Sequence, residues 1–187
     1  MSNRRAAMRR ERMEREKINK SKSPTAEYER AVMQGTLDGR VYGACIVLCT
    51  VKKLYKMSKK NLSKLLEASN KEAVKFNEDA TMFNLQFYQD KMFEKLQKTP
   101  VKTYVNNAKE KIYVMRRNEL FISSCCLMFL ALKQEFGFSS NSKGTGRIDI
   151  IMEYVLNEYI KMQYDKTRDI EFYIKKTKEE TGISFVD

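Results

Sequence analysis

Glycine and proline are so scarce in this chain that most of it is expected to be regular structure. The 187 residues include seven glycines and two prolines, too few for the many tight turns of a β-sandwich or β-barrel of this length. An apolar content of 42% is enough for a core, and the abundant Met, Lys, Glu, Leu and Ala are good helix formers. The sequence therefore predicts an all-α fold with five to seven helices in one compact domain.

Charge divides the chain into two parts. The first 22 residues hold nine cations and three glutamates, which is half of the total net charge of +12. Removing water from so many charges is costly, so this segment gains little from burial. We expect a basic, partly disordered N-terminal arm over residues 1–22 and a helical domain over residues 23–187.

Apolar periodicity and helix breakers place the expected helices. Ser23 as a cap and Pro24 in the first turn predict a helix over 24–34, followed by a connector at 35–39 between two glycines. Apolar spacings of three and four predict helices over 40–56, from Ser58 to about residue 74, over 79–98 with a stop at Thr99–Pro100, and over 148–162. In the first of these, Ile46, Val47 and Thr50 also fit a strand. Residues 101–135 form one helix or two, and a last helix covers 166–181. Glycines at 137 and 182 end the helices that precede them.

Four cysteines lie inside apolar stretches, at positions 45, 49, 125 and 126. We interpret them as buried thiols in a reducing cytoplasm. A zinc site would require paired Cys-x-x-Cys spacing or histidine, and the chain has no histidine. The longest apolar run, residues 120–132, is shorter than the ~20 residues that cross a bilayer. We expect no cofactor, no membrane span and a cytoplasmic location.

Catalysis has little support in the sequence. Without histidine the usual general base is missing, and the cysteines lack the partner that would activate them as nucleophiles. The carboxylates are scattered and do not form the pattern of a two-metal nuclease. The sequence predicts a protein that is not an enzyme.

The arm is the strongest candidate binding site. Arginine forks match phosphate geometry and stay charged, and each neutralised phosphate releases a condensed counterion. An acidic protein partner, or a solvated tail with no partner, are the alternatives. The arm residues assigned to nucleic-acid binding are Arg4, Arg5, Arg9, Arg10, Arg12, Arg15, Lys17 and Lys20.

A second basic cluster follows the first long apolar stretch. Tyr55 lies among its lysines, where it either stacks on a base or packs in the core. A solvated helix face is the alternative. Three later lysines at 175, 176 and 178 are offset by Glu179 and Glu180, which favours a solvated face there. The residues assigned to the second cluster are Lys52, Lys53, Lys56, Lys59 and Lys60.

Residues 139–146 read Ser-Ser-Asn-Ser-Lys-Gly-Thr-Gly and form the clearest loop. Glycines expose backbone N–H groups at the start of the next helix, where an anion can bind beside Lys143 and Arg147. The loop is not a Walker motif, and a loop with no ligand is the alternative.

Residues 57–66 resemble the first helix of a helix-turn-helix motif, with a cap followed by Leu-x-x-Leu-Leu. A recognition helix would then follow a turn at 69–72. One uninterrupted amphipathic helix is the favoured interpretation.

Residues 130–138 read Leu-Ala-Leu-Lys-Gln-Glu-Phe-Gly-Phe, and Arg147 and an amphipathic helix follow. This segment, residues 130–159, resembles one in small uncharacterised helical proteins of Firmicutes phages and prophages, which read Ala-Leu, then Phe-Gly-Phe-Gly, then Arg and an amphipathic helix. A longer Ser/Asn/Gly loop replaces their tight glycine turn here. The resemblance implies phage origin and a helical hairpin, and it transfers no catalytic residue.

These observations lead to three functional hypotheses. The first is a non-enzymatic DNA- or RNA-binding accessory or regulatory protein. The second is an anti-defence protein of the anti-CRISPR kind, which binds a host nucleoprotein effector or its nucleic acid in the host cytoplasm. The third is a structural component of the virion. The sequence does not decide between DNA and RNA, or between a monomer and a homodimer.

Overall fold

Helices account for nearly all of the chain that the structure describes. The computed structural model describes residues 24–78, 82–97, 107–165 and 167–185, and in these ranges it contains six α-helices and no strand. This confirms the all-α prediction. The helices are α2 (Pro24–Tyr55), α3 (Lys59–Glu78), α4 (Met82–Gln97), α5 (Ala108–Phe136), α6 (Arg147–Tyr164) and α7 (Ile170–Thr181).

The predicted break between residues 35 and 39 is wrong, because α2 runs through it without interruption. Gly35, Gly39 and Gly43 are four residues apart and so lie on one face of the helix. A Cβ atom on Gly39 would lie 2.3 Å from the Arg117 carbonyl oxygen, and one on Gly35 would lie 2.7 Å from the Tyr113 carbonyl oxygen. The glycines therefore allow the backbones of α2 and α5 to approach closely, and they do not mark a turn.

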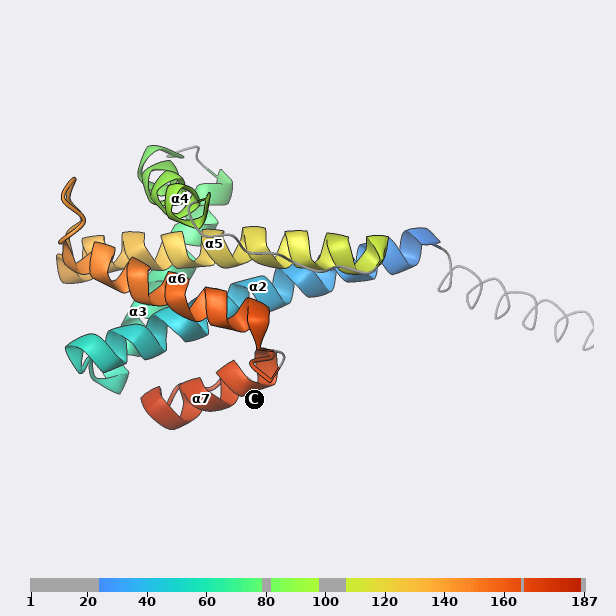
Figure 1. Ribbon diagram of the computed structural model, residues 1–187. Coiled ribbons are helices and arrows are strands. Elements are labelled where there is room, and N and C mark those ends of the chain that lie inside the picture. Colours follow the sequence, from blue (N-terminus) through green and yellow to red (C-terminus); the bar gives the residue numbers. More distant parts are fainter. Residues whose placement is uncertain (1–23, 79–81, 98–106, 166, 186–187) are drawn as a thin grey trace, which may run out of the picture.

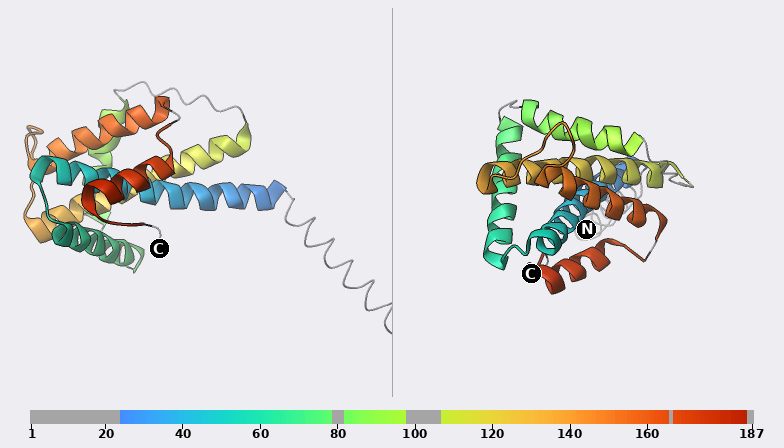
Figure 2. Two further views of the ribbon diagram at one scale, coloured as in Figure 1. Left: turned by 90° about the horizontal axis from the view of Figure 1, so that it is seen from below. Right: turned by 60° about the vertical axis from the view of Figure 1, so that its left-hand side comes forward.

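The pair α2 and α5 is the centre of the molecule (Figure 1). The other helices pack around it, with α4 and α7 on opposite sides, while α3 runs across the C-terminal half of α5 towards α4 (Figure 2). Aromatic contacts join α6 and α7 to the pair: Tyr159 stacks on Phe121 at 4.7 Å between ring centroids, and Tyr173 meets Tyr42 edge-on at 5.6 Å. All six helices contribute buried residues to one hydrophobic core.

The first turns of α2 and α5 extend past the other helices (Figures 1 and 2). We call residues 24–37 and 108–116 the projecting end. Lys109 and Glu27 join its two helices through an ion pair of 3.7 Å.

The favoured single amphipathic helix is confirmed and the helix-turn-helix alternative is wrong, because α3 continues through residues 69–72. Ser69 is buried there, and its hydroxyl donates a hydrogen bond of 2.9 Å to the Leu66 carbonyl oxygen. The predicted cap of this helix is confirmed: the Asn61 N–H donates to the Ser58 hydroxyl oxygen at 3.3 Å.

The predicted ends of α5 and α7 are confirmed. Gly137 has φ 65° and Gly182 has φ 74°, in the left-handed region that favours glycine. After Gly137 the chain turns into the core, where Phe138 is buried. The predicted cap at Ser23 and the predicted stop at Thr99–Pro100 lie outside the described residues.

Within the described ranges, no helix combines the length and the apolar character that a membrane span requires.

A candidate basic pocket between α2, α6 and α7

Three of the predicted lysines line one pocket, which lies between α2, α6 and α7 and has a volume of about 400 Å³. Lys52, Lys53 and Lys56 come from the end of α2, and a fourth lysine, Lys176, comes from α7. Tyr154 of α6 also lines the pocket. The structure thus brings together cations that are more than 100 positions apart in the sequence.

The end of α2 positions these lysines. Lys56 has φ 53° and ends the helix, and its N–H donates a hydrogen bond of 3.0 Å to the Lys52 carbonyl oxygen. The Lys52 ammonium in turn donates to the Met57 carbonyl oxygen at 3.2 Å. Cations are favoured at this position because the C-terminal end of a helix carries partial negative charge.

Tyr154 is the exposed aromatic side chain of the pocket, with 42% of its surface accessible. The Lys53 ammonium lies over its ring, 5.6 Å from the centroid. Such a contact is a weak cation–π interaction at an exposed position, so either group can exchange it for another partner.

Two glutamates also line the pocket, and other cations neutralise them. Lys161 and Arg168 bind the Glu158 carboxylate at 2.8 and 2.9 Å. Burial opposes ionisation of Glu158, but Lys161, Lys176 and Arg168 together hold its pKa below the ordinary value. Glu180 lies 4.0 Å from the Lys176 ammonium. Within the described chain, neither Lys53 nor Lys56 has an acidic partner, so the pocket keeps unpaired positive charge.

The inner wall of the pocket is neutral at physiological pH. Burial raises the pKa of Cys49 to about 11 and that of Tyr173 to about 12. The Cys49 sulfur lies 3.4 Å from the Thr177 hydroxyl. All four cysteines are free and buried, as predicted, and a buried neutral thiol is a poor nucleophile.

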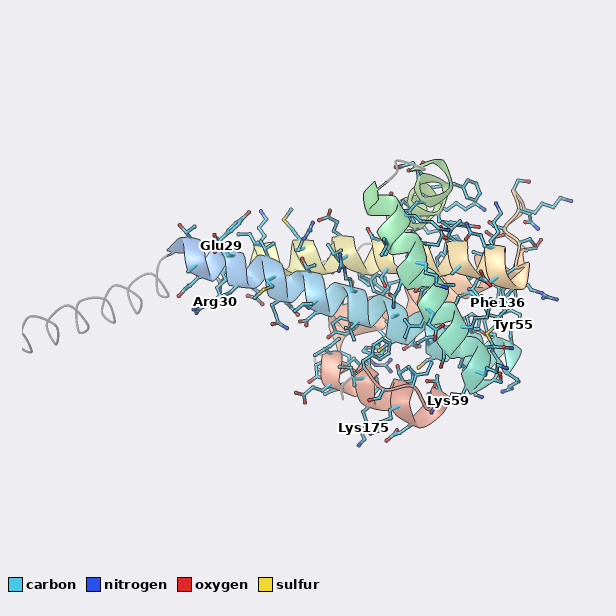
Figure 3. All side chains as sticks on the ribbon, turned by 180° about the vertical axis from the view of Figure 1, so that it is seen from behind. Glu29, Arg30, Tyr55, Lys59, Phe136 and Lys175 are labelled. Carbon is cyan, nitrogen blue, oxygen red and sulfur yellow. The ribbon has the colours of Figure 1, made fainter. Side chains whose placement is uncertain are left out.

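Lys59 and Lys60 extend the basic surface beyond the pocket, because both are exposed in the first turn of α3. The Lys59 side chain passes beside Gly182, and its Cδ lies 3.2 Å from where a Cβ of Gly182 would stand. Lys59 and Lys175 accordingly lie on neighbouring elements (Figure 3). Lys176 of α7 lines the pocket, whereas its sequence context indicated only a solvated face.

Tyr55 packs in the protein, which decides between its two predicted roles. Its ring meets Phe138 edge-on at 4.9 Å, and its hydroxyl donates to the Arg147 carbonyl oxygen at 3.3 Å. The Arg147 guanidinium is exposed and lies 5.2 Å from the centre of the Phe138 ring. This places Arg147 next to the end of α2.

The loop of residues 139–146 uses its backbone donors internally. The Asp149 carboxylate accepts hydrogen bonds from the N–H groups of Gly146 at 3.1 Å and Asn141 at 2.9 Å. The Thr145 N–H donates to the Asn141 side-chain oxygen at 3.0 Å. The Asp149 carboxylate therefore already accepts from the backbone N–H groups that were expected to bind an external anion. The side chains of Lys143 and Arg147 remain exposed, and their contribution to binding stays a prediction.

The arm lies outside the described residues, and so do its eight predicted contacts. In the described ranges, no group of three or more His, Cys, Asp or Glu residues could hold a metal ion. Comparisons with protein-family models, curated proteins and solved structures found no match for this chain. The resemblance to phage proteins therefore stays a prediction.

Proposed function

We propose that this protein binds nucleic acid in the cytoplasm without catalysing a reaction, using the basic pocket and the N-terminal arm. The observation that carries this proposal is the convergence of Lys52, Lys53, Lys56 and Lys176 on one pocket. The phage origin that the sequence resemblance implies would make the protein an accessory or regulatory factor acting in the host cell.

Electrostatics supports a polyanion as the ligand. Lys53 and Lys56 are exposed, and within the described residues neither forms an ion pair, because the two glutamates of the pocket pair with other cations. Lysines gathered at a concave surface raise the local concentration of anions. A phosphate backbone gains from such a surface because binding releases its counterions.

Fluorescence anisotropy with labelled DNA and RNA at low salt tests the proposal. The full-length double variant Lys53→Glu/Lys56→Glu should bind at least about tenfold more weakly, because two phosphate contacts become repulsive. The matched control is Arg30→Glu/Lys111→Glu, which makes the same change in net charge at the projecting end. If both variants lose the same affinity, the effect is one of net charge alone, and the pocket is rejected as the binding site.

A second function is favoured by the apolar side chains of the projecting end. Met33 and Met115 are 61% and 62% exposed, and Tyr28 and Leu37 of α2 are 52% and 53% exposed. Large exposed apolar side chains on an end of a protein that no other helix covers are available for contact with a partner. They support the anti-defence hypothesis, in which the protein binds a host nucleoprotein effector.

Salt separates the two functions. A complex held by apolar contacts should survive about 0.5 M salt and nuclease treatment, whereas binding through phosphates should not. Pull-downs from host cells, with and without nuclease, make this comparison. Met33→Glu/Met115→Glu should abolish only a complex of the apolar kind.

A further inference from the structure

Two aromatic residues line the basic pocket, and they differ in exposure. Tyr154 presents an exposed ring beside the lysines, whereas Tyr173 is buried. Electrostatics alone does not require an aromatic ring there, because phosphates are bound equally well by lysines in a polar wall. Proteins that bind single-stranded nucleic acid combine these two elements: cations follow the backbone, and aromatic rings stack on the bases.

The geometry fits one nucleotide. The pocket volume of about 400 Å³ lies within the ~300–1,000 Å³ of pockets for small molecules. The Lys53 ammonium lies 5.6 Å from the Tyr154 ring centroid, so a base on this ring would have its flanking phosphate within reach of Lys53. Lys56, at the end of α2, and Lys176, in α7, line the same pocket.

A base can meet Tyr154 only if it is unpaired and unstacked. In a duplex, neighbouring base pairs cover both faces of each base, and only base edges and phosphates are accessible to the protein. We propose that the pocket binds a single-stranded nucleic acid, with one base stacked on Tyr154 and the adjacent phosphates on Lys53, Lys56 and Lys176. This inference rests on the proposed function and names the ligand class of the same site.

Fluorescence anisotropy with the full-length protein tests the inference. The probes are an oligothymidylate and an oligouridylate of about 12 nucleotides, a duplex of equal length, and an abasic strand with the same phosphates. The wild-type protein should bind both single strands at least about fivefold more tightly than the abasic strand, since stacking of one base on an aromatic ring contributes at least about that factor. This comparison requires no variant.

Variants locate the effect at Tyr154. Tyr154→Leu should weaken binding of the two single strands at least about fivefold and leave the abasic strand and the duplex unchanged. Tyr154→Phe keeps the ring and should stay within about twofold of wild type. Tyr164→Leu, at the exposed end of the same helix, is the matched control and should have no effect.

The possible results separate the inference from the proposed function. If Lys53→Glu/Lys56→Glu abolishes binding while Tyr154→Leu does not weaken it, the pocket binds phosphates and the stacking inference is overturned. Equal affinity of the wild-type protein for the oligothymidylate and the abasic strand would overturn it too. If the wild-type protein binds none of the probes at low salt, the proposed function fails and the inference fails with it.

Discussion

The buried Asp149 carboxylate holds the loop between α5 and α6 in place. Only 2% of its surface is exposed, and its carboxylate also accepts a 3.0 Å contact from the Lys91 ammonium of α4. Lys91 donates in addition to Ser140 at 2.8 Å and to the Asn141 carbonyl oxygen at 3.0 Å. One carboxylate thus joins the loop, the start of α6 and α4. The sequence did not indicate this role, because a lone aspartate in the first turn of a helix is usually only a cap.

Replacing Asp149 by Asn should destabilise the protein by about 2–4 kcal/mol at neutral pH, because the Lys91 ammonium loses its buried partner. Urea unfolding followed by circular dichroism measures the change. Asp90→Asn, on the exposed face of α4, should cost less than about 0.5 kcal/mol.

The stabilities of the wild-type protein and of Asp149→Asn should depend differently on pH. Burial alone would raise the pKa of Asp149, but hydrogen bonds from Ser140 and Asn141 and the charge of Lys91 hold it below its ordinary value of 3.8. A carboxylate whose pKa is lower in the folded than in the unfolded state stabilises the folded protein at pH values above the unfolded-state pKa. This contribution is lost as the pH falls through the folded-state pKa. The stability difference between wild type and Asp149→Asn should therefore shrink below about pH 4. A difference that stays constant on acidification would contradict this role of the carboxylate.

At the scale of helices, sequence signals predict the structure correctly where residues close by in the sequence determine it. The cap at Ser58, the left-handed glycines at 137 and 182, and the helix after the Ser/Asn/Gly loop depend on residues close by in the sequence. The connector at 35–39 was wrong because its glycines meet the backbone of α5, which lies more than 70 residues later. Nothing local distinguishes a glycine in a turn from a glycine in a close helix contact.

The candidate site follows the same rule. Lys52, Lys53 and Lys56 are one helix segment, and their clustering is visible in the sequence. Tyr154 and Lys176 come from two other helices, so only the packing of α6 and α7 on α2 brings them to the pocket. Sequence periodicity places such residues on a helix face, but it does not identify the helix opposite.

Gly39→Ala tests the close contact of α2 and α5. Alanine in the middle of a helix normally stabilises it by about 1 kcal/mol relative to glycine. Here the new methyl group would lie 2.3 Å from a backbone oxygen of α5 and 2.9 Å from the Leu120 Cβ. The helices must separate, and we expect a loss of about 2–4 kcal/mol in thermal or urea unfolding. Met33→Ala, on an exposed position of the same helix, is the control and should change stability by less than about 0.5 kcal/mol.

At the scale of the whole molecule, positive charge is concentrated in two places, the arm and the surface around the basic pocket. The arm contributes half of the net charge, and it leads directly into the first turn of α2. The pocket lies at the other end of that helix, where Lys52, Lys53 and Lys56 end α2. The start of α2, which the arm precedes in the sequence, is separated from the pocket by the length of this helix, roughly 48 Å for its 32 residues. An extended polyanion is long enough to contact the start of α2 and the pocket together, whereas a single nucleotide or a small anion is not.

This arrangement predicts how binding depends on salt. On a long single strand, replacing the six arm arginines by glutamine should reduce the slope of log K against log salt by about 4, at about 0.7 for each phosphate. Lys53→Gln/Lys56→Gln should reduce it by about 1.4 for the same reason. If one strand occupies both places, the two reductions should add in the combined variant. On strands too short to span α2, the arm and the pocket compete for the same phosphates, so the combined variant should lose less than the sum. Additivity that does not change with strand length would show that the arm and the pocket bind separate ligands.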